Sequence, residues 1–278
     1  MPFAWVSLCT LWLKNTFTKN TPTFTFMCLI NFAFQHHASY PFILVGNRDE
    51  FYNRATRKLQ WWEDEFPEIL AGKDLQEGGT WMGINKTGQF AALTNYRDLN
   101  NINTNAPSRG HLVSNFLKGK LHTDEMHQLL KTQGRLYNGF NLIYGDVSAL
   151  FYYSNVTDHV RQLYPGIYGL SNALLDTPWP KVVNSKAAFT EQLSEPLNPT
   201  PFIEILNNTD TAPEEELPET GVPLELEKRL SAMFITSNNY GTRLTTFVSI
   251  NNQGEVTYRE KGYVPEHDVT VNFTIKAG

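Results

Sequence analysis

The sequence predicts a layered α+β domain, in which two mainly antiparallel β-sheets pack face to face and helices cover their outer sides. Three observations support this fold class. Strand-type and helix-type runs alternate in blocks, namely strands, two helices, strands, helices and a last strand pair. That last pair is a clear hairpin over residues 243–259. The chain also has no internal repeat, and no linker long or flexible enough to divide it.

The first half of the chain begins with strands. Strand-type runs lie at residues 27–34, 42–45, 81–84 and 90–94. A turn that contains His36, His37 and Pro41 separates the first two runs, which predicts a hairpin. A turn at residues 85–88 joins the next two, and Gly88 supplies the positive φ that such a turn needs.

Helix-type runs follow in two blocks, at residues 110–118, 124–133, 181–193, 202–206 and 224–230. Thr123 is the expected N-cap of the second helix, because acidic residues fill its first turn. The remaining strands are expected at residues 141–144, 149–153, 166–170, 243–250 and 255–259. Residues 204–227 carry eight acids and no base, which is typical of a solvated loop.

Composition limits the classes of function. The net charge of −5 and a pI of about 5.8 argue against nucleic acid or an anionic membrane as the main partner. Two cysteines exclude a disulfide framework, so a reducing, cytoplasmic location is expected. The seven histidines have no metal-ligand spacing, and neither a metal site nor a cofactor motif is predicted.

The most informative pair is Met27-Cys28, at the start of the first strand-type run. A cysteine behind a start methionine becomes the first residue once that methionine is removed, and it then carries both a thiol and a free α-amine. An α-amine has a pKa of about 8 and can accept the proton of the thiol. This pairing of a nucleophile with an adjacent base is the chemistry of an N-terminal nucleophile hydrolase. The alternative is a buried core cysteine.

Residues 1–26 place Cys28 inside the chain. Their apolar run at 3–13 is far shorter than the roughly 20 residues that span a bilayer, and it lacks the flanks of a signal peptide. Either translation starts at Met27, or a precursor is cut before Cys28. We favour the first, so residues 1–26 are expected to be an extension outside the mature protein and residues 27–278 a single domain.

Candidate partners of Cys28 end the second strand, in Asn47-Arg48-Asp49-Glu50. A positive charge at Arg48 would lower the pKa of the thiol, and the carboxylate of Asp49 could orient the α-amine. Successive strand residues point to opposite faces, so both can face Cys28 only if the strand ends or bulges there. The alternative is an ion pair that caps the strand.

Three further polar residues lie at strand ends: Asn95, Asn172 and Arg243. The side-chain N–H groups of asparagine can stabilise an oxyanion in the transition state of acyl transfer. Taken singly, each asparagine is more often a turn former, and Arg243 is more often a surface residue of a strand.

Several motifs together resemble one family. They are Met-Cys-Leu-Ile at 27–30, Asn-Arg-Asp-Glu at 47–50, Gly-Gly-Thr-Trp at 78–81, Ala-Ala-Leu-Thr-Asn-Tyr-Arg at 91–97, Ala-Pro-Ser-Arg-Gly at 106–110, Tyr-Asn-Gly-Phe-Asn-Leu at 137–142, Gly-Leu-Ser-Asn-Ala-Leu-Leu-Asp-Thr-Pro-Trp-Pro-Lys-Val at 169–182 and Tyr-Gly-Thr-Arg at 240–243. Over residues 27–264 the chain resembles the NRDE-motif family, that of the transport-and-Golgi-organisation protein. Residues 1–26 have no counterpart in it.

The resemblance implies a four-layer αββα fold of the N-terminal nucleophile hydrolase type, distantly similar to choloylglycine hydrolases and penicillin V acylases. By order and local context, the catalytic residues of those enzymes fall on the following positions of this sequence: Cys28, Arg48, Asp49, Asn95, Asn172 and Arg243. One departure concerns Asp49. The acylases separate their arginine and aspartate by two residues, whereas Arg48 and Asp49 adjoin, so Asn47 or Glu50 could take the role of the aspartate.

The resulting functional hypothesis is a cysteine hydrolase for a small-molecule amide, without a cofactor. Arg48 and Arg243 would hold the thiolate or a carboxylate of the substrate, while Asn95 and Asn172 would stabilise the oxyanion. The alternative, implied by eukaryotic members of the family, is a carrier for haem or acyl lipids, in which His36 or His37 could bind the haem. A third alternative is a scaffold without catalytic activity.

Overall fold

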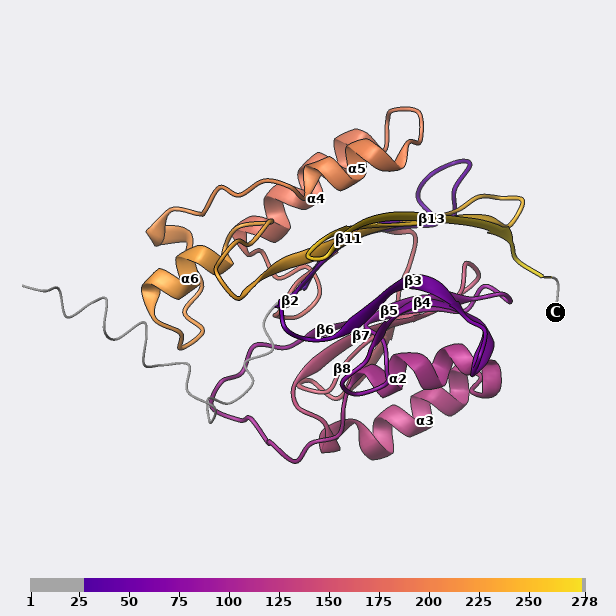
Figure 1. Cartoon of the computed structure of the whole chain (residues 1–278), viewed down its shortest axis with the longest axis horizontal. Coiled ribbons are helices and arrows are strands. Elements are labelled where there is room, and N and C mark those ends of the chain that lie inside the picture. The colour runs from indigo at the N-terminus through magenta and orange to yellow at the C-terminus, as the bar shows by residue number, and fades with distance from the viewer. Residues whose placement is uncertain (1–27, 277–278) are drawn as a thin grey trace, which may run out of the picture.

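The computed structural model describes residues 28–276, which form two antiparallel sheets that lie face to face between two layers of helices (Figure 1). This arrangement confirms the predicted four-layer αββα sandwich. The expectations for residues 1–26, and for Met27, concern a part of the chain outside the described residues.

The first sheet has six strands in the order β10-β1-β2-β11-β12-β13, and neighbouring strands are antiparallel. Its strands are β1 (Cys28–Phe34), β2 (Phe42–Phe51), β10 (Gly166–Leu170), β11 (Tyr240–Ile250), β12 (Glu255–Tyr263) and β13 (Glu266–Thr274). The predicted hairpin of the first two runs is confirmed. Because β11 lies beside β2, the late Tyr-Gly-Thr-Arg motif reaches the end of the sheet where Cys28 lies.

The second sheet has seven strands in sequence order, again antiparallel. They are β3 (Thr56–Trp62), β4 (Phe66–Asp74), β5 (Met82–Asn85), β6 (Phe90–Asn95), β7 (Phe140–Gly145), β8 (Leu150–Ser154) and β9 (His159–Gln162). The turn between β5 and β6 has the predicted positive φ at Gly88, which is +87°.

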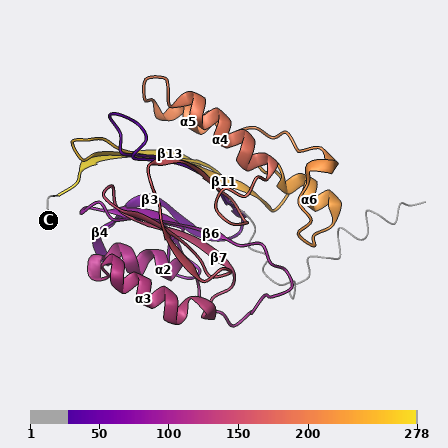
Figure 2. The same cartoon turned by 180° about the vertical axis from the view of Figure 1, so that it is seen from behind.

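The helices form the two outer layers (Figures 1 and 2). The second sheet is covered by α2 (Gly110–Asn115), which continues into a π-turn, and by α3 (Thr123–Gln133). The first sheet is covered by α4 (Pro180–Gln192) and α5 (Pro199–Ile205), and α6 (Leu224–Leu230) follows them. No helix within residues 28–276 is long and apolar enough to cross a membrane.

Three apolar layers hold the sandwich together. Between the sheets pack residues such as Phe32, Leu44 and Ile143. The second layer lies between the first sheet and its helices, where Phe247 of β11 packs with Phe202 of α5. The third layer, between the second sheet and its helices, includes Phe116, Met126 and Phe140. Side chains alternate between the two faces of a strand, so the strands of the first sheet contribute to both of its layers.

Four strands were not predicted, namely β3, β4, β9 and β13. Three of these lie at sheet edges, where one face meets solvent and polar residues are tolerated. In β13, exposed and partly buried residues alternate, so its apolar signal is diluted by polar positions. The prediction of Thr123 as an N-cap was also wrong: the helix begins at Thr123, and Glu125 accepts the backbone N–H of His122 at 2.8 Å.

Candidate active site

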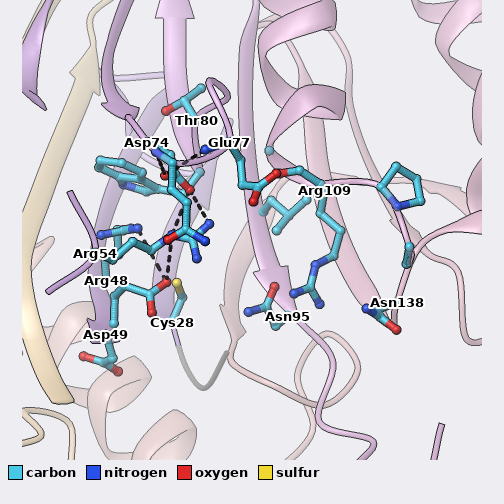
Figure 3. A pocket seen from close by; sticks show the side chains of 18 of the residues that line it. Cys28, Arg48, Asp49, Arg54, Asp74, Glu77, Thr80, Asn95, Arg109 and Asn138 are labelled. Atoms are coloured by element: carbon cyan, nitrogen blue, oxygen red, sulfur yellow. Dashed lines mark hydrogen bonds and ion pairs between the residues drawn. The ribbon is translucent and has the colours of Figure 1, made fainter. Parts of the chain in front are cut away.

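Cys28 opens β1 and is paired directly with Arg48 of β2. Directly paired residues of antiparallel strands point to the same face of the sheet, so both side chains face the second sheet. Cys28 is partly exposed and is not in a disulfide. The hairpin therefore brings the predicted nucleophile and the predicted arginine together, as Figure 3 shows.

Arg48 lies between the sheets, and one of its guanidinium nitrogens has no hydrogen-bond partner among the described residues. The residue is only 6% exposed, and its Cζ lies 4.1 Å from the ring centroid of Trp81, a cation–π contact. Its Nη2 lies 3.6 Å from Oε2 of Glu50, whereas Nη1 is buried and has no hydrogen-bond partner among the described residues. A buried donor without a partner is costly, which favours a ligand acceptor beside Cys28.

Cys28 and Arg48 line a cavity of about 230 Å³. Most of its other walls are polar, and they include Arg54, Asp74, Glu77, Asn95, Asn103, Arg109 and Asn138. In Figure 3, Arg54 and Asp74 lie on the side of Arg48, and Asn95, Arg109 and Asn138 lie on the other. Arg54 donates two hydrogen bonds to Oδ2 of Asp74, at 2.9 and 2.6 Å, so this arginine is largely neutralised within the wall.

The acidity of the Cys28 thiol differs from the prediction. Burial, with the charge of Asp49 as a second cause, raises the pKa of the thiol to about 12. Arg48 lowers the pKa, as predicted, and so does a hydrogen bond from the backbone N–H of Asp49. These two effects are the smaller ones, so within the full chain the structure favours the thiol over the thiolate.

Asp49 points to the helical side of the first sheet, away from the face that carries Arg48 (Figure 3). The register of β2 against β1 stays regular here, so the bulge that would turn both side chains toward Cys28 is not present in this pair. Oδ1 of Asp49 accepts a 2.5 Å hydrogen bond from the Thr242 hydroxyl. Oδ2 is buried and has no hydrogen-bond partner among the described residues.

Lys181 of α4 is a buried charge near Asp49 that sequence reasoning missed. Its Nζ donates to the carbonyl oxygen of Leu230 at 3.0 Å. Burial raises the pKa of Asp49 to about 6, and the attraction of Lys181 is the largest effect that opposes it. Burial and then the charge of Arg97 lower the pKa of Lys181 to about 7. The signal was a lysine at an inward position of an amphipathic helix.

The two asparagines lie together, but only one lines the cavity. Asn95 ends β6 and is part of the cavity wall. Asn172 is buried behind it, where its Nδ2 donates to the backbone carbonyl of Asn95 at 2.9 Å and its Oδ1 accepts from Ser171 at 2.9 Å. The Ser171 hydroxyl also lies 3.0 Å from the carbonyl oxygen of Cys28. Asn172 therefore ties the end of β6 to the strand that carries the cysteine.

Arg243 lies at a β-bulge of β11, between the paired residues Thr242 and Leu244. Its guanidinium donates to the carbonyl oxygens of Val264 at 2.9 Å, of Phe51 at 3.2 Å and of Arg54. It does not belong to the described wall of the cavity. The structure thus places Arg243 as a clamp that joins the turn at residues 51–54 to Val264, rather than beside the thiol.

His36 and His37 lie in the turn at the far end of the β1–β2 hairpin from Cys28. The strand between them and the cysteine has seven residues, which corresponds to roughly 20 Å. His37 accepts the backbone N–H of Ser39 and packs on Tyr40. Among residues 28–276, no group of three or more His, Cys, Asp or Glu side chains could hold a metal ion.

The site residues that sequence reasoning missed come mostly from the second sheet and its loops. They are Arg54, Asp74, Trp81 and Arg109. Arg109 lies in the Ala-Pro-Ser-Arg-Gly motif and Trp81 in Gly-Gly-Thr-Trp, so the motifs marked both positions without indicating a role.

Fold and site together define an αββα sandwich protein with a cysteine at the start of its first strand, facing a polar cavity. The chain belongs to the Transport and Golgi organisation 2 family, whose family model matches residues 27–265. It is 37% identical over 261 residues to the Transport and Golgi organization 2 homolog of Mus musculus. The alignment covers 84% of this chain and 92% of that protein. The Transport and Golgi organization protein 2 of Drosophila melanogaster is 27% identical over 272 residues, with the same coverage.

Solved structures with a similar chain trace include two hydrolases. A variant of the conjugated bile acid hydrolase from Clostridium perfringens gives a TM-score of 0.47 at 11% identity, and covers 87% of this chain and 92% of that one. The Caenorhabditis elegans ortholog of N-acylethanolamine-hydrolyzing acid amidase gives 0.42 at 11% identity, covering 79% and 92%. The αββα architecture itself follows from the sheet order of this chain.

Proposed function

We propose that the protein is an N-terminal-cysteine hydrolase for a small amide, with Cys28 as the nucleophile of a chain that begins at residue 28. The observation that carries this proposal is the position of Cys28, which opens the first strand, faces a polar cavity and lies directly opposite Arg48. We also propose a single domain over residues 27–278. A cytosolic location is proposed because the reaction needs a reduced thiol.

The proposed reaction has two steps. The α-amine of Cys28 takes the proton of the thiol, and the sulfur bonds to the carbonyl carbon of the substrate. The resulting α-ammonium then gives this proton to the amide nitrogen as the C–N bond breaks, and the amine leaves behind a thioester. Water attacks the thioester with the α-amine as its base, and the acid and the free thiol are released.

Asp49 fits the role of anchoring the α-ammonium, because its buried Oδ2 has no other partner in the described chain. Asp49 also belongs to the cavity wall, while its Oδ1 is engaged by the Thr242 hydroxyl. Asn95 would donate to the oxyanion from the cavity wall. We assign Asn172 and Arg243 to positioning: Asn172 holds Asn95, and Arg243 holds the ends of the strands around the site.

The alternative is a carrier without turnover, and the names of the relatives refer to transport. Two observations favour the hydrolase over a haem carrier. His36 and His37 lie at the wrong end of the hairpin to reach the cavity. The cavity volume of about 230 Å³ also lies below the range of roughly 300–1,000 Å³ that is usual for drug-sized ligands, which suits a small substrate better than a porphyrin.

The test compares wild type with Cys28→Ser, both as chains that begin at residue 28 and contain every strand and helix that the structure describes. N-acyl amino acids from N-acetyl upward, penicillin V and γ-glutamyl amides are the substrates, and haem and acyl-coenzyme A are titrated alongside. A hydrolase loses several powers of ten in turnover with this substitution, because the acyl-enzyme needs the sulfur. Tight binding of haem or acyl-coenzyme A in both proteins, with no turnover of any amide, would establish the carrier instead.

A further inference from the structure

Two cavities of very different character meet at Cys28. The outer one is the polar cavity of about 230 Å³ described above, and the inner one is a void of about 10 Å³ between the sheets. Four residues line both: Cys28, Arg48, Trp81 and Leu93. A group bonded to the sulfur of Cys28 therefore has two places into which its ends can extend.

The inner void is small and mainly apolar. Its walls include Ile30, Met82, Leu244 and Thr246, all of which are buried. A void of this volume accommodates about one water molecule, or a group of similar size such as a methyl. Gly46 also lines it, and a side chain there would come within 3.1 Å of Cγ1 of Ile30. Buried side chains therefore bound most of the inner void.

The outer cavity, in contrast, opens to solvent. Its rim includes the exposed residues Gln76, Glu77, Asn103 and Thr104, which lie on loops. Charged and amide side chains, among them Arg109 and Asn138, line its interior. A polar group can enter and leave on this side without any movement of the apolar core.

The order of bond breaking decides which end of the substrate lies on which side. In the proposed reaction the amine departs first, while the acyl group stays bonded to the sulfur of Cys28 until water attacks. The amine needs a route to solvent, and the water enters where the amine has left, so the amine belongs in the outer cavity. The inner void, which Cys28 also lines, is the second place available to the acyl group, and the proposal puts it there.

We infer that the acyl group of the substrate has at most two carbons, a formyl or an acetyl group, and that the amine part is polar. This inference rests on the proposed function and adds the substrate class to it. The carbonyl carbon lies at the sulfur, and the void beyond it accommodates one further carbon atom. A longer acyl chain would have to displace Met82 or Leu244 from a packed core.

The test measures acyl transfer to the chain that begins at Cys28. The probes are the 4-nitroanilides and the 4-nitrophenyl esters of acetic, butyric and octanoic acid, and thioester formation is followed by intact mass. We expect the rate of acetyl transfer to exceed the rate of butyryl transfer by about tenfold or more. One additional methylene in a packed pocket changes the relative rates of two substrates by roughly that factor. Octanoyl transfer should be slower still.

A gain of function makes the test specific to the void. Met82→Ala enlarges it, so the ratio of butyryl to acetyl transfer should rise about tenfold. Leu244→Ala removes another wall of the same void and serves if Met82→Ala does not fold. Met126→Ala is the matched control: Met126 is equally buried, but it packs between the second sheet and its helices, so the acyl preference should not change.

The possible failures are distinct. Transfer of octanoyl as fast as acetyl by wild type, or an equal change of preference in Met126→Ala, would overturn the two-carbon limit and leave the hydrolase standing. The absence of any acyl group on Cys28, together with no cleavage of any amide, would overturn both proposals.

Discussion

The Thr242 hydroxyl donates a 2.5 Å hydrogen bond to Oδ1 of Asp49, and at 2.9 Å it accepts the backbone N–H of Ile235. Because the oxygen of Thr242 already accepts from Ile235, its single proton is directed at the carboxylate. One oxygen of Asp49 is therefore occupied from the side of β11, and the other remains available at the start of β1. Thr242, near the start of β11, therefore positions the carboxylate of Asp49. Arg48, the neighbour of Asp49 in the chain, faces the cavity.

We expect Thr242→Val to destabilise the fold. The substitution leaves the N–H of Ile235 and Oδ1 of Asp49 without this partner, and an unsatisfied buried polar group costs about 1–3 kcal/mol. Thr246→Val is the matched control for stability, because Thr246 lies on the same strand and its buried hydroxyl has no partner among the described residues. Chemical denaturation should show a loss for Thr242→Val and none for Thr246→Val. Equal losses would contradict the importance of the bond.

The reactivity of the Cys28 thiol should depend on where the chain begins. In the full chain the raised pKa predicts alkylation at pH 7 slower than that of a free cysteine, whose pKa is about 8.5. A chain that begins at Cys28 should react faster, because its α-ammonium adds a positive charge beside the sulfur. Rates with iodoacetamide, measured by intact mass, provide the comparison.

Arg48→Ala should slow the alkylation of either chain, since Arg48 lowers the pKa of the thiol. Arg161→Ala, an exposed position on β9, should leave the rate unchanged. A full chain that alkylates at pH 6–7 faster than free cysteine would show that burial does not control this thiol.

Much of the site could be predicted from the sequence where it depends on local structure. A hairpin places Arg48 opposite Cys28 by register alone, and strand alternation already separated Arg48 from Asp49 unless a bulge intervened. The position of Asn95 at the end of β6 likewise followed from the strand-type run at residues 90–94 that precedes it.

The rest depends on contacts between distant segments. Trp81 lies over Arg48 only because the two sheets pack face to face, and no pattern along the chain indicates which residues meet across that layer. The clamp by Arg243 depends on a bulge in β11 and on three carbonyl oxygens from two other segments, the turn at residues 51–54 and Val264. In the sequence, nothing distinguishes Lys181 from other lysines of a helix. Its proximity to Asp49 depends on how α4 packs on the first sheet.

The stability of the protein should depend on pH through Asp49. Its pKa is about 6 in the folded chain against an ordinary 3.8, so between these values the folded state holds a proton that the unfolded state has released. The contribution of Asp49 to the free energy of unfolding therefore falls as the pH rises from about 4 to 6. Asp49→Asn should remove that fall, as seen by thermal unfolding across this range. Asp64→Asn, at an exposed turn, should keep the wild-type profile.

The start of the mature protein is the prediction on which the catalytic proposal depends most directly. Cys28 can use its α-amine as a base only if no residue precedes it, because an amide nitrogen in a peptide bond does not accept a proton at neutral pH. Intact mass and N-terminal sequencing of protein made from its native gene should therefore show a chain that begins at Cys28. A native protein that retains residues 1–27 would rule out the α-amine mechanism and leave the cavity as a binding site.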